Sequence, residues 1–307
     1  MNEYTNGHYY SLNQYLRETF GGKVYKIALS GGFTCPNRDG TIGTRGCIFC
    51  SEGGSGEFAA DRRLSVTQQI EQAKLRVRSK TKDNKFIAYF QTFTSTYMAS
   101  EKLEAMLLEA VSDESICAVS AGTRPDCLPD DILDVLARIN RIKPVWAELG
   151  LQTSNERTAR YIRRGYSLSV YEEAAEKLKK LGINVITHVI IGLPGETRED
   201  MLSTVSYAGR FTDGIKLQLL HVLKNTDLAS EYEKGAFSVL SQDEYISIIC
   251  DCIEVLPKNV VIHRLTGDGD KKLLIAPLWS GNKKVVLNAL NKELERRNIY
   301  QGSSNKQ

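Results

Sequence analysis

The chain has 307 residues, of which 42% are hydrophobic and 25% are charged, and its formal net charge at pH 7 is +3. These values are those of an ordinary globular protein and argue against a disordered or fibrous chain. The small positive charge permits an acidic partner such as RNA without requiring one. The sequence contains no apolar run of about 18 residues, the length that suggests a membrane-spanning helix, so we expect no membrane partner.

The cysteines of this chain are interpreted from the compartment in which we expect it to lie. The first residues show no charged-then-apolar signal pattern, so we expect a cytoplasmic location, where thiols stay reduced. In such a compartment, seven cysteines indicate metal binding or catalysis before disulfides.

Strand-like apolar runs alternate with helical patterns along most of the chain. The runs cover residues 23–30, 85–91, 115–121, 144–150, 183–191 and 214–220. They are short, and several are β-branched or aromatic, as expected for parallel strands buried on both faces. The helical patterns between and after them cover residues 65–79, 101–111, 130–139, 155–164, 169–181 and 198–211. Capping-box pairs predict the starts of three helices: Ser65 with Gln68, Ser169 with Glu172, and Ser241 with Glu244.

Six β–α units in series predict an α/β fold, in which a parallel sheet is covered by helices because each crossover is right-handed. An open doubly wound sheet or a partial (β/α)6 TIM-like barrel satisfies this pattern. We divide the chain into an N-terminal extension at 1–22, a core at 23–229 and a C-terminal α/β extension at 230–300. The extension holds a strand at 260–265 and helices at 241–256 and 283–297, and the polar tail at 301–307 is expected to be disordered.

The most informative motif follows the first strand, where Cys35 precedes a Cys-x-x-Cys pair formed by Cys47 and Cys50. Glycines in the same loop allow the backbone to wrap closely around an inorganic centre. Three thiolates on a cuboidal four-iron cluster leave one iron open, and the amino and carboxylate groups of S-adenosylmethionine (SAM) suit that position. The alternative is a structural zinc site, which usually takes four ligands. The loop offers no fourth ligand at local spacing, although distant His8 or another cysteine is a candidate.

The remaining cysteines are interpreted as buried and inert. They are Cys117, Cys127, Cys250 and Cys252. Cys250 and Cys252 lie two apart in a helical run and so do not face each other.

The cysteine loop resembles that of the radical SAM superfamily, in its variant with a widened gap between the first two cysteines. The resemblance extends over residues 23–227. It implies a partial β/α barrel with a [4Fe–4S] cluster on Cys35, Cys47 and Cys50, and SAM bound with its adenine beside Phe49. It also implies a flavodoxin- or ferredoxin-type electron donor.

Further polar motifs follow later strands, at the end of a β/α barrel that holds the active site. Residues 91–97 depart from the family's Gly-Gly-Glu-like segment, and Thr92 or Thr94 would bind the SAM amino group there unless the segment is a Thr-rich turn. Gln152 and Arg164 match positions that bind SAM in the branch resembling oxygen-independent coproporphyrinogen oxidase, the guanidinium forming a fork on the SAM carboxylate. Gly192 lies in a Gly-Leu-Pro-Gly turn that is similar to the family's Gly-x-Pro turn, and the resemblance implies that adenine packs against it.

Two histidines are candidate catalytic residues, His188 and His221, although a lone histidine is more often a satisfied core residue. His188 should point towards the barrel interior. On the sixth strand, Lys216 and Gln218 fit either a substrate contact or a core-edge role.

The motifs together look closest to the YhcC/YtqA-like bacterial branch, with an elongator-type core whose Thr-Arg-Pro-Asp segment matches 123–126. This resemblance implies tRNA modification, the most specific candidate being conversion of a carboxymethylaminomethyl group on a wobble uridine to aminomethyl. Two alternatives stay open. One is a radical SAM enzyme acting on a small metabolite or porphyrin-like acid, and the other is a metal-stabilised RNA-binding module without catalysis.

Overall fold

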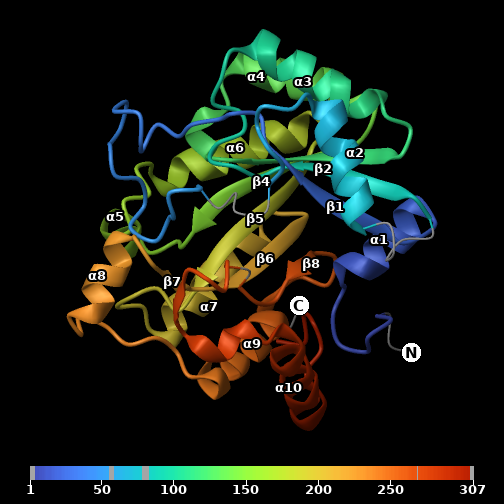
Figure 1. Ribbon diagram of the computed structural model, residues 1–307. Helices are drawn as coiled ribbons and strands as arrows, with labels where there is room; N and C mark the ends of the chain where they lie inside the picture. The colour runs from blue at the N-terminus through green and yellow to red at the C-terminus, as the bar shows by residue number, and fades with distance from the viewer. Residues whose placement is uncertain (1–3, 55–58, 78–82, 268, 305–307) are drawn as a thin grey trace.

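Seven parallel strands form one curled sheet in the computed structural model, which describes residues 4–54, 59–77, 83–267 and 269–304. In their order across the sheet, the strands are β1 (Val24–Leu29), β2 (Lys85–Phe90), β3 (Ile116–Thr123), β4 (Val145–Gln152), β5 (Asn184–Ile191), β6 (Gly214–Leu219) and β8 (Val261–Arg264). Each neighbouring pair is parallel. The sheet curls into a half-barrel (Figure 1), which confirms the predicted partial TIM-like barrel.

The sheet contains one strand more than the six expected. β8 comes from the segment predicted as a C-terminal extension, and it pairs with β6 through Gly214 opposite Val261 and Ile215 opposite Ile262. An edge strand leaves a row of unpaired backbone groups, so β8 extends the sheet where β6 would otherwise end it.

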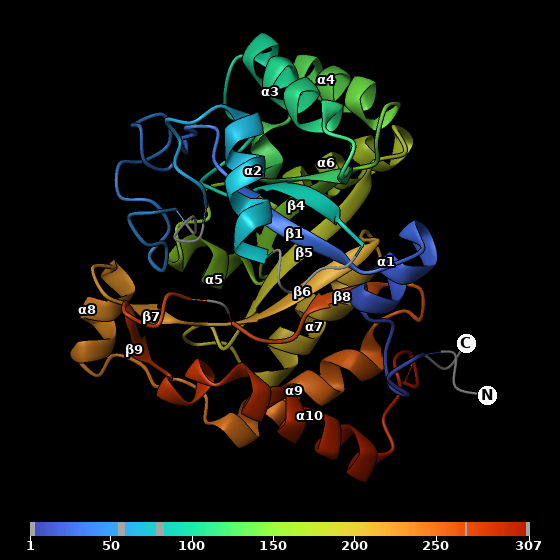
Figure 2. The ribbon, with the colours of Figure 1, turned by 45° about the vertical axis from the view of Figure 1, so that its right-hand side comes forward.

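The helices cover the outside of the half-barrel (Figures 1 and 2). They are α1 (Leu12–Phe20), α2 (Val66–Val77), α3 (Ser100–Ser112), α4 (Asp130–Asn140), α5 (Glu156–Tyr161), α6 (Leu168–Lys180), α7 (Arg198–Gly209), α8 (Asp227–Glu233), α9 (Gln242–Val255) and α10 (Lys283–Arg297). Between them and the sheet lies a continuous apolar core. Strand β2, for example, is buried on both faces from Phe86 to Phe90, as its uninterrupted apolar run predicts.

Two of the three predicted capping boxes form. Ser65 and Gln68 exchange side-chain to backbone hydrogen bonds of 3.1 and 3.2 Å before α2, and Ser241 caps α9 together with Glu244. The third prediction is wrong, because α6 begins one residue before Ser169 and its N-cap is Ser167. The last residues of the predicted helix at 65–79 lie outside the described residues.

The described segments near the two ends of the chain, around His8 and Gln301, lie side by side (Figure 2). Gln301 is 1% exposed, and its side-chain amide donates to the carbonyls of Pro257 and Val260 at 2.6 and 2.8 Å. Its backbone N–H donates to the His8 carbonyl at 2.9 Å. The tail predicted to be disordered at 301–307 therefore begins with an ordered residue, while 305–307 lie outside the described residues.

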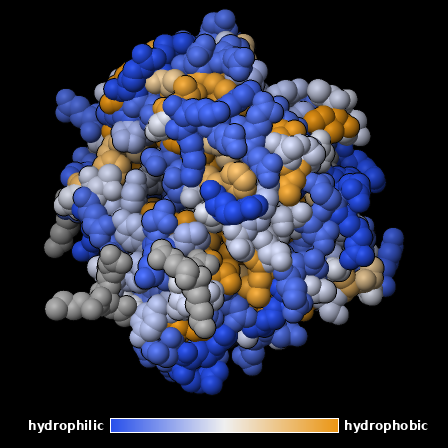
Figure 3. Space-filling view, turned by 180° about the vertical axis from the view of Figure 1, so that it is seen from behind, coloured by the Kyte–Doolittle hydropathy of each residue, from blue (hydrophilic) through white to orange (hydrophobic). Residues whose placement is uncertain are grey.

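The surface opposite to the view of Figure 1 is mainly hydrophilic, with small separate apolar patches (Figure 3). Within the described ranges, no helix is both long and apolar enough to cross a membrane.

Candidate functional site

A cavity of about 250 Å³ opens at the carboxyl ends of the strands. The cysteine loop forms one wall, and side chains from β2, β4, β5, β6 and β8 form the others. In parallel α/β folds this edge of the sheet holds the active site, because the loops after every strand converge there.

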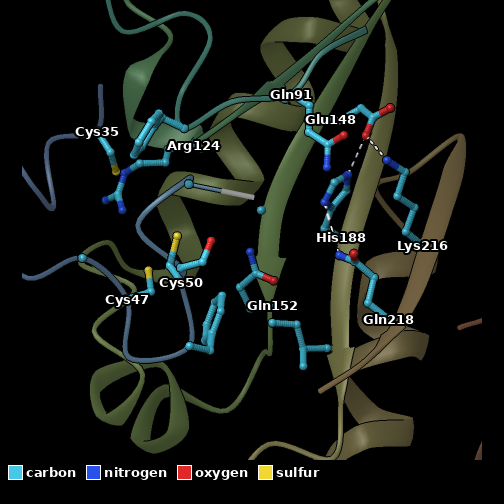
Figure 4. Close-up of a pocket in the computed structure, with 18 of the residues that line it drawn as sticks. Cys35, Cys47, Cys50, Gln91, Arg124, Glu148, Gln152, His188, Lys216 and Gln218 are labelled. Atoms are coloured by element: carbon cyan, nitrogen blue, oxygen red, sulfur yellow. Dashed lines mark hydrogen bonds and ion pairs between the residues drawn. The ribbon is translucent and has the colours of Figure 1, made fainter. Parts of the chain in front are cut away.

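All three predicted cluster cysteines line this cavity, together with Phe49. Cys35, Cys47 and Cys50 are each half-buried, and they lie on the same side of the cavity in Figure 4. Their loop is closed by backbone hydrogen bonds, from Arg38 N–H to the Cys35 carbonyl at 2.8 Å and from Cys50 N–H to the Cys47 carbonyl at 3.0 Å. In the described part of the chain, no three His, Cys, Asp or Glu side chains are arranged to hold one metal ion. A cuboidal cluster does not require three ligands around one ion, because each thiolate binds a different iron.

The loop is also tied to the barrel by polar side chains. Asn37 donates from its amide to the Cys47 sulfur at 3.5 Å and to the Arg163 carbonyl at 2.8 Å. The Arg38 guanidinium donates to the carbonyls of Cys50 and Ser51 at 2.9 and 2.6 Å. The backbone at Gly46 lies directly against the Arg38 side chain. Its φ is +72°, and a β-carbon there would come within 2.9 Å of Arg38 Nε, so this position favours glycine.

Gln152 enters the cavity from the end of β4 in a strained conformation. Its φ is +66°, and the register between β4 and β5 shifts at this residue. Its side chain lies over Gly150, where a β-carbon would come within 2.8 Å of Gln152 Nε2. Gln152 Oε1 is buried and has no hydrogen-bond partner among the described residues. Strain and an unsatisfied buried acceptor together are typical of a ligand-binding position.

Arg164 lines the cavity, but its guanidinium is engaged by its own chain. It donates to the carbonyls of Tyr166, Leu151 and Thr153 at 3.0, 3.3 and 2.7 Å, and to Glu156 at 2.9 Å. These bonds take four of the five N–H donors of the group. In this structure Arg164 therefore fixes the loop after β4 instead of presenting the free fork that the sequence predicts for a carboxylate.

The other predicted binding residues divide into two groups. Thr94 and His221 line the cavity, whereas Thr92 and Gly192 are not among the described residues that do so. Gly192 donates its N–H to the Met201 sulfur at 3.2 Å, and its turn packs against Leu240.

A polar layer that the sequence analysis did not assemble crosses the barrel interior below the cysteines. We call it the interior layer, and each strand of the sheet contributes one member: Lys26, Tyr89, Ser120, Glu148, His188, Lys216 and Arg264. Figure 4 shows Glu148, His188 and Lys216 on the side of the cavity opposite the cysteines. The sequence signal was an ionisable residue inside each of several apolar strands, a position that normally excludes charge.

Glu148 is the centre of this layer, and its side chain is 0% exposed. Its Oε1 accepts from Lys26 Nζ and from Ser120 Oγ, both at 2.6 Å. Its Oε2 accepts from His188 Nε2 at 2.7 Å and pairs with Lys216 Nζ. Burial raises the pKa of this carboxyl, but the charges of Lys216 and Lys26 outweigh it, so the pKa lies well below its usual value and Glu148 is ionised.

For the lysines of the interior layer, the effect of burial on the pKa outweighs that of the Glu148 carboxylate. Burial, together with the charges of Lys26 and Arg264, lowers the pKa of Lys216 to about 7, although the Glu148 carboxylate opposes the shift. Burial likewise lowers the pKa of Lys26. Lys216 also donates to the Tyr89 hydroxyl at 3.1 Å.

His188 is held as a neutral imidazole by the same layer. Burial, followed by the Lys216 charge, lowers the pKa of His188 to about 4. Its Nε2–H then donates to Glu148, which leaves Nδ1 to accept from the Gln218 amide at 3.4 Å.

We therefore predict that His188 does not take up a proton between about pH 5 and 8. Its ring proton signal, identified by its loss in His188→Gln, should not move in an NMR titration over that range. Because this histidine takes up its proton near the ordinary pKa of 6.5 in the unfolded chain, the stability present above that pH is lost as the pH falls towards 4. A titration midpoint near 6.5 in the folded protein would contradict this assignment.

Comparison with known families decides the class of the protein. The Radical SAM superfamily model matches residues 37–208, and the Radical_SAM C-terminal domain model matches residues 212–296. The chain belongs to the radical SAM superfamily. Members of this superfamily are enzymes that use a [4Fe–4S] cluster and SAM, so the non-catalytic alternative is set aside.

Several relatives extend this assignment. The chain is 48% identical to the uncharacterized protein YtqA of Bacillus subtilis over 97% of this chain and 93% of that one. It is 36% identical to the protein YhcC of Escherichia coli K12 over 94% of this chain and 93% of that one. Among solved structures, Elp3 of the archaeon Methanocaldococcus infernus shares the fold with a TM-score of 0.69 at 18% identity, over 91% of this chain and 64% of that one. A more distant match, 25% identical over 55% of this chain and 32% of the other, is a tRNA uridine(34) acetyltransferase of Methanocaldococcus jannaschii.

Proposed function

We propose that Cys35, Cys47 and Cys50 bind the [4Fe–4S] cluster and that SAM lies between them and Gln152. The observation that carries this proposal is that three half-buried thiols share one cavity with a buried amide oxygen to which no described residue donates. A hydroxyl or amino group of SAM would give Gln152 Oε1 the donor it lacks, and Phe49 offers an apolar face to the adenine.

The residues around the thiols also suit a cluster. The Asn37 amide points at the Cys47 sulfur, and N–H···S bonds of this kind stabilise thiolate charge and tune a cluster's potential. When bound, SAM and the cluster supply a 5′-deoxyadenosyl radical that removes a hydrogen atom from the substrate. A flavodoxin- or ferredoxin-type protein is the proposed electron donor.

For the substrate we infer a tRNA, with the side chain of a wobble uridine as the reacting group. The relative named as a tRNA uridine(34) acetyltransferase supports this choice. The charge of the cavity supports it too. Among the described residues that line it, Arg38, Arg124, Arg164, Lys216 and Arg264 are basic, whereas Glu148 is the one acid. Arg124 and Arg164 are each paired with an acid outside the lining, Asp126 and Glu156, so the other three carry the positive charge of the cavity.

The specific reaction proposed is conversion of a carboxymethylaminomethyl group to aminomethyl. Hydrogen removal from the carbon between the nitrogen and the carboxylate, followed by loss of one electron and one proton, would give an imine. Water would then release the aminomethyl group and glyoxylate, with SAM, cleaved to 5′-deoxyadenosine and methionine, as the net oxidant.

The test is the modified-nucleoside profile of tRNA from a strain that lacks the gene. Mass spectrometry should show that the carboxymethylaminomethyl nucleoside accumulates and that its aminomethyl products disappear. The wild-type gene and Cys117→Ala should restore the profile, whereas a gene encoding alanine at Cys35, Cys47 and Cys50 should not. An unchanged profile, with SAM cleavage retained by the purified protein, would instead favour a small acid as substrate.

A further inference from the structure

The interior layer carries more positive than negative charge. Lys26 and Lys216 both contact Glu148, and the charge of Arg264 acts on both lysines. Below about pH 7, where Lys216 is an ammonium, two ammonium groups among the described residues therefore contact one carboxylate, with the Arg264 guanidinium acting on both. A net charge that is largely withdrawn from water is costly, so this arrangement favours any ligand that brings an anion to it.

Glu148 cannot itself receive a substrate cation without losing a partner. A carboxylate has about four lone-pair sites, and Lys26, Ser120, His188 and Lys216 occupy them. Glu148 is therefore a positioning residue that holds Lys216 and His188 in place.

Lys216, in contrast, has donor capacity directed to the cavity. Its side chain is 5% exposed, and it lines the cavity together with Arg264. An ammonium carries three N–H donors, and Glu148 and the Tyr89 hydroxyl take two of them. The third is available to an acceptor on a ligand.

The depth of the site decides which anion fits. The backbone phosphates of a polynucleotide stay on the outside of a folded protein, whereas Lys216 lies inside the barrel, across the cavity from the cysteines (Figure 4). An anion at the end of a short side chain, inserted into the cavity, can reach it. Hydrogen bonds from a lysine or an arginine to a carboxylate are charge-assisted and stronger than those between neutral groups.

We propose that Lys216 and Arg264 form a subsite for a carboxylate on the substrate. The inference rests on the proposed function for its choice of cavity, and it adds that the group entering the cavity is anionic. The carboxymethylamino group of a modified uridine has this chemistry. With its carboxylate on Lys216, the atoms next to the nitrogen would lie between the interior layer and the thiols.

The test compares a charged ligand with its neutral counterpart. Calorimetry on the anaerobically reconstituted holoenzyme with SAM would measure binding of 5-carboxymethylaminomethyluridine and of its methyl ester. The acid should bind at least about tenfold tighter than the ester, as expected when a buried charged hydrogen bond is removed. In Lys216→Met the affinity for the acid should fall most of the way towards that for the ester, because only Arg264 remains, while the affinity for the ester stays unchanged.

Two further variants keep the test decisive. Lys102→Met makes the same chemical change on the exposed face of α3 and should leave both affinities as in the wild type. If Lys216→Met does not fold, Arg264→Gln, at a half-buried position, should reduce the preference for the acid on its own. Equal affinities for acid and ester in the wild type would overturn the subsite alone. Binding of neither compound would overturn both the subsite and the wobble-uridine substrate.

Discussion

Protein in which Cys35, Cys47 and Cys50 are all replaced by alanine is expected to hold no cluster and to leave SAM intact. The wild-type protein, reconstituted without oxygen, should carry about four irons per chain. Since the thiolates supply the protein's bonds to the cluster, their removal should reduce both iron content and the release of 5′-deoxyadenosine with dithionite to the detection limit. Iron analysis and chromatography of the products measure the two quantities separately.

A matched variant separates cluster loss from general damage. Cys117 lies in β3, and its thiol is 3.2 Å from the Phe86 carbonyl, away from the cavity. Cys117→Ala makes the same chemical change and should retain iron and SAM cleavage. SAM cleavage at the wild-type rate in the triple variant would exclude these three thiols as the cluster ligands.

The regular elements could be predicted from the sequence because each depends on neighbours along the chain. The run that forms β2 is apolar at consecutive positions, which marks a strand buried on both faces. Ser241 and Glu244 specify the start of α9 through bonds three residues apart. The cysteine loop could be predicted in the same way, because the spacing of its cysteines is itself a local pattern.

The interior layer could not be assembled in the same way. Lys26, Glu148 and Lys216 come from three different strands, and their contact depends on the curl of the sheet, which brings β1 and β6 to face β4 across the barrel. No pattern within one strand reveals that partnership. What the sequence does show is that each residue is a charge inside an apolar run, and a buried charge requires a partner.

Arg164 and Gln152 show that the resemblance to the family predicts which residues lie at the cavity but not the contacts they make there. Both lie at the cavity, as their positions in the sequence suggest. The role of Arg164 is nonetheless decided by nearby carbonyls, which occupy most of its donors. That of Gln152 is decided by a positive φ, which turns its amide into the cavity. Neither the carbonyl positions nor the sign of φ is encoded by residue type alone.

Glu148→Gln is expected to be among the most destabilising single substitutions in this chain. It removes the carboxylate that neutralises Lys26 and Lys216 and places an amide N–H₂ where donors already point. Breaking a buried ion pair from one side costs on the order of 3–5 kcal/mol, because the remaining charges stay buried without a counter-charge. Urea unfolding of the cluster-free protein at pH 6 measures the loss.

The effect should shrink as the pH rises. In the wild type the pKa of Lys216 is already lowered from 10.5 to about 7, and Glu148 is the group that opposes this lowering. Without Glu148 the folded pKa falls further, so between that pKa and 10.5 the folded chain binds fewer protons than the unfolded chain. The stability of Glu148→Gln then increases with pH across this window, whereas that of the wild type increases only above about pH 7. The loss in Glu148→Gln should therefore be smaller at pH 9 than at pH 6, and the change should occur below about pH 7.

A surface pair provides the control for this prediction. Glu104 and Arg138 are joined by a 2.6 Å bond between α3 and α4, with side chains 30% and 47% exposed. Glu104→Gln removes the same charge and should cost much less than Glu148→Gln, because water solvates the remaining guanidinium. Adding Lys216→Met to Glu148→Gln should recover part of the lost stability, since one of the stranded cations is removed. A loss in Glu148→Gln no larger than that in Glu104→Gln would show that the charges of the interior layer are solvated and not buried as described.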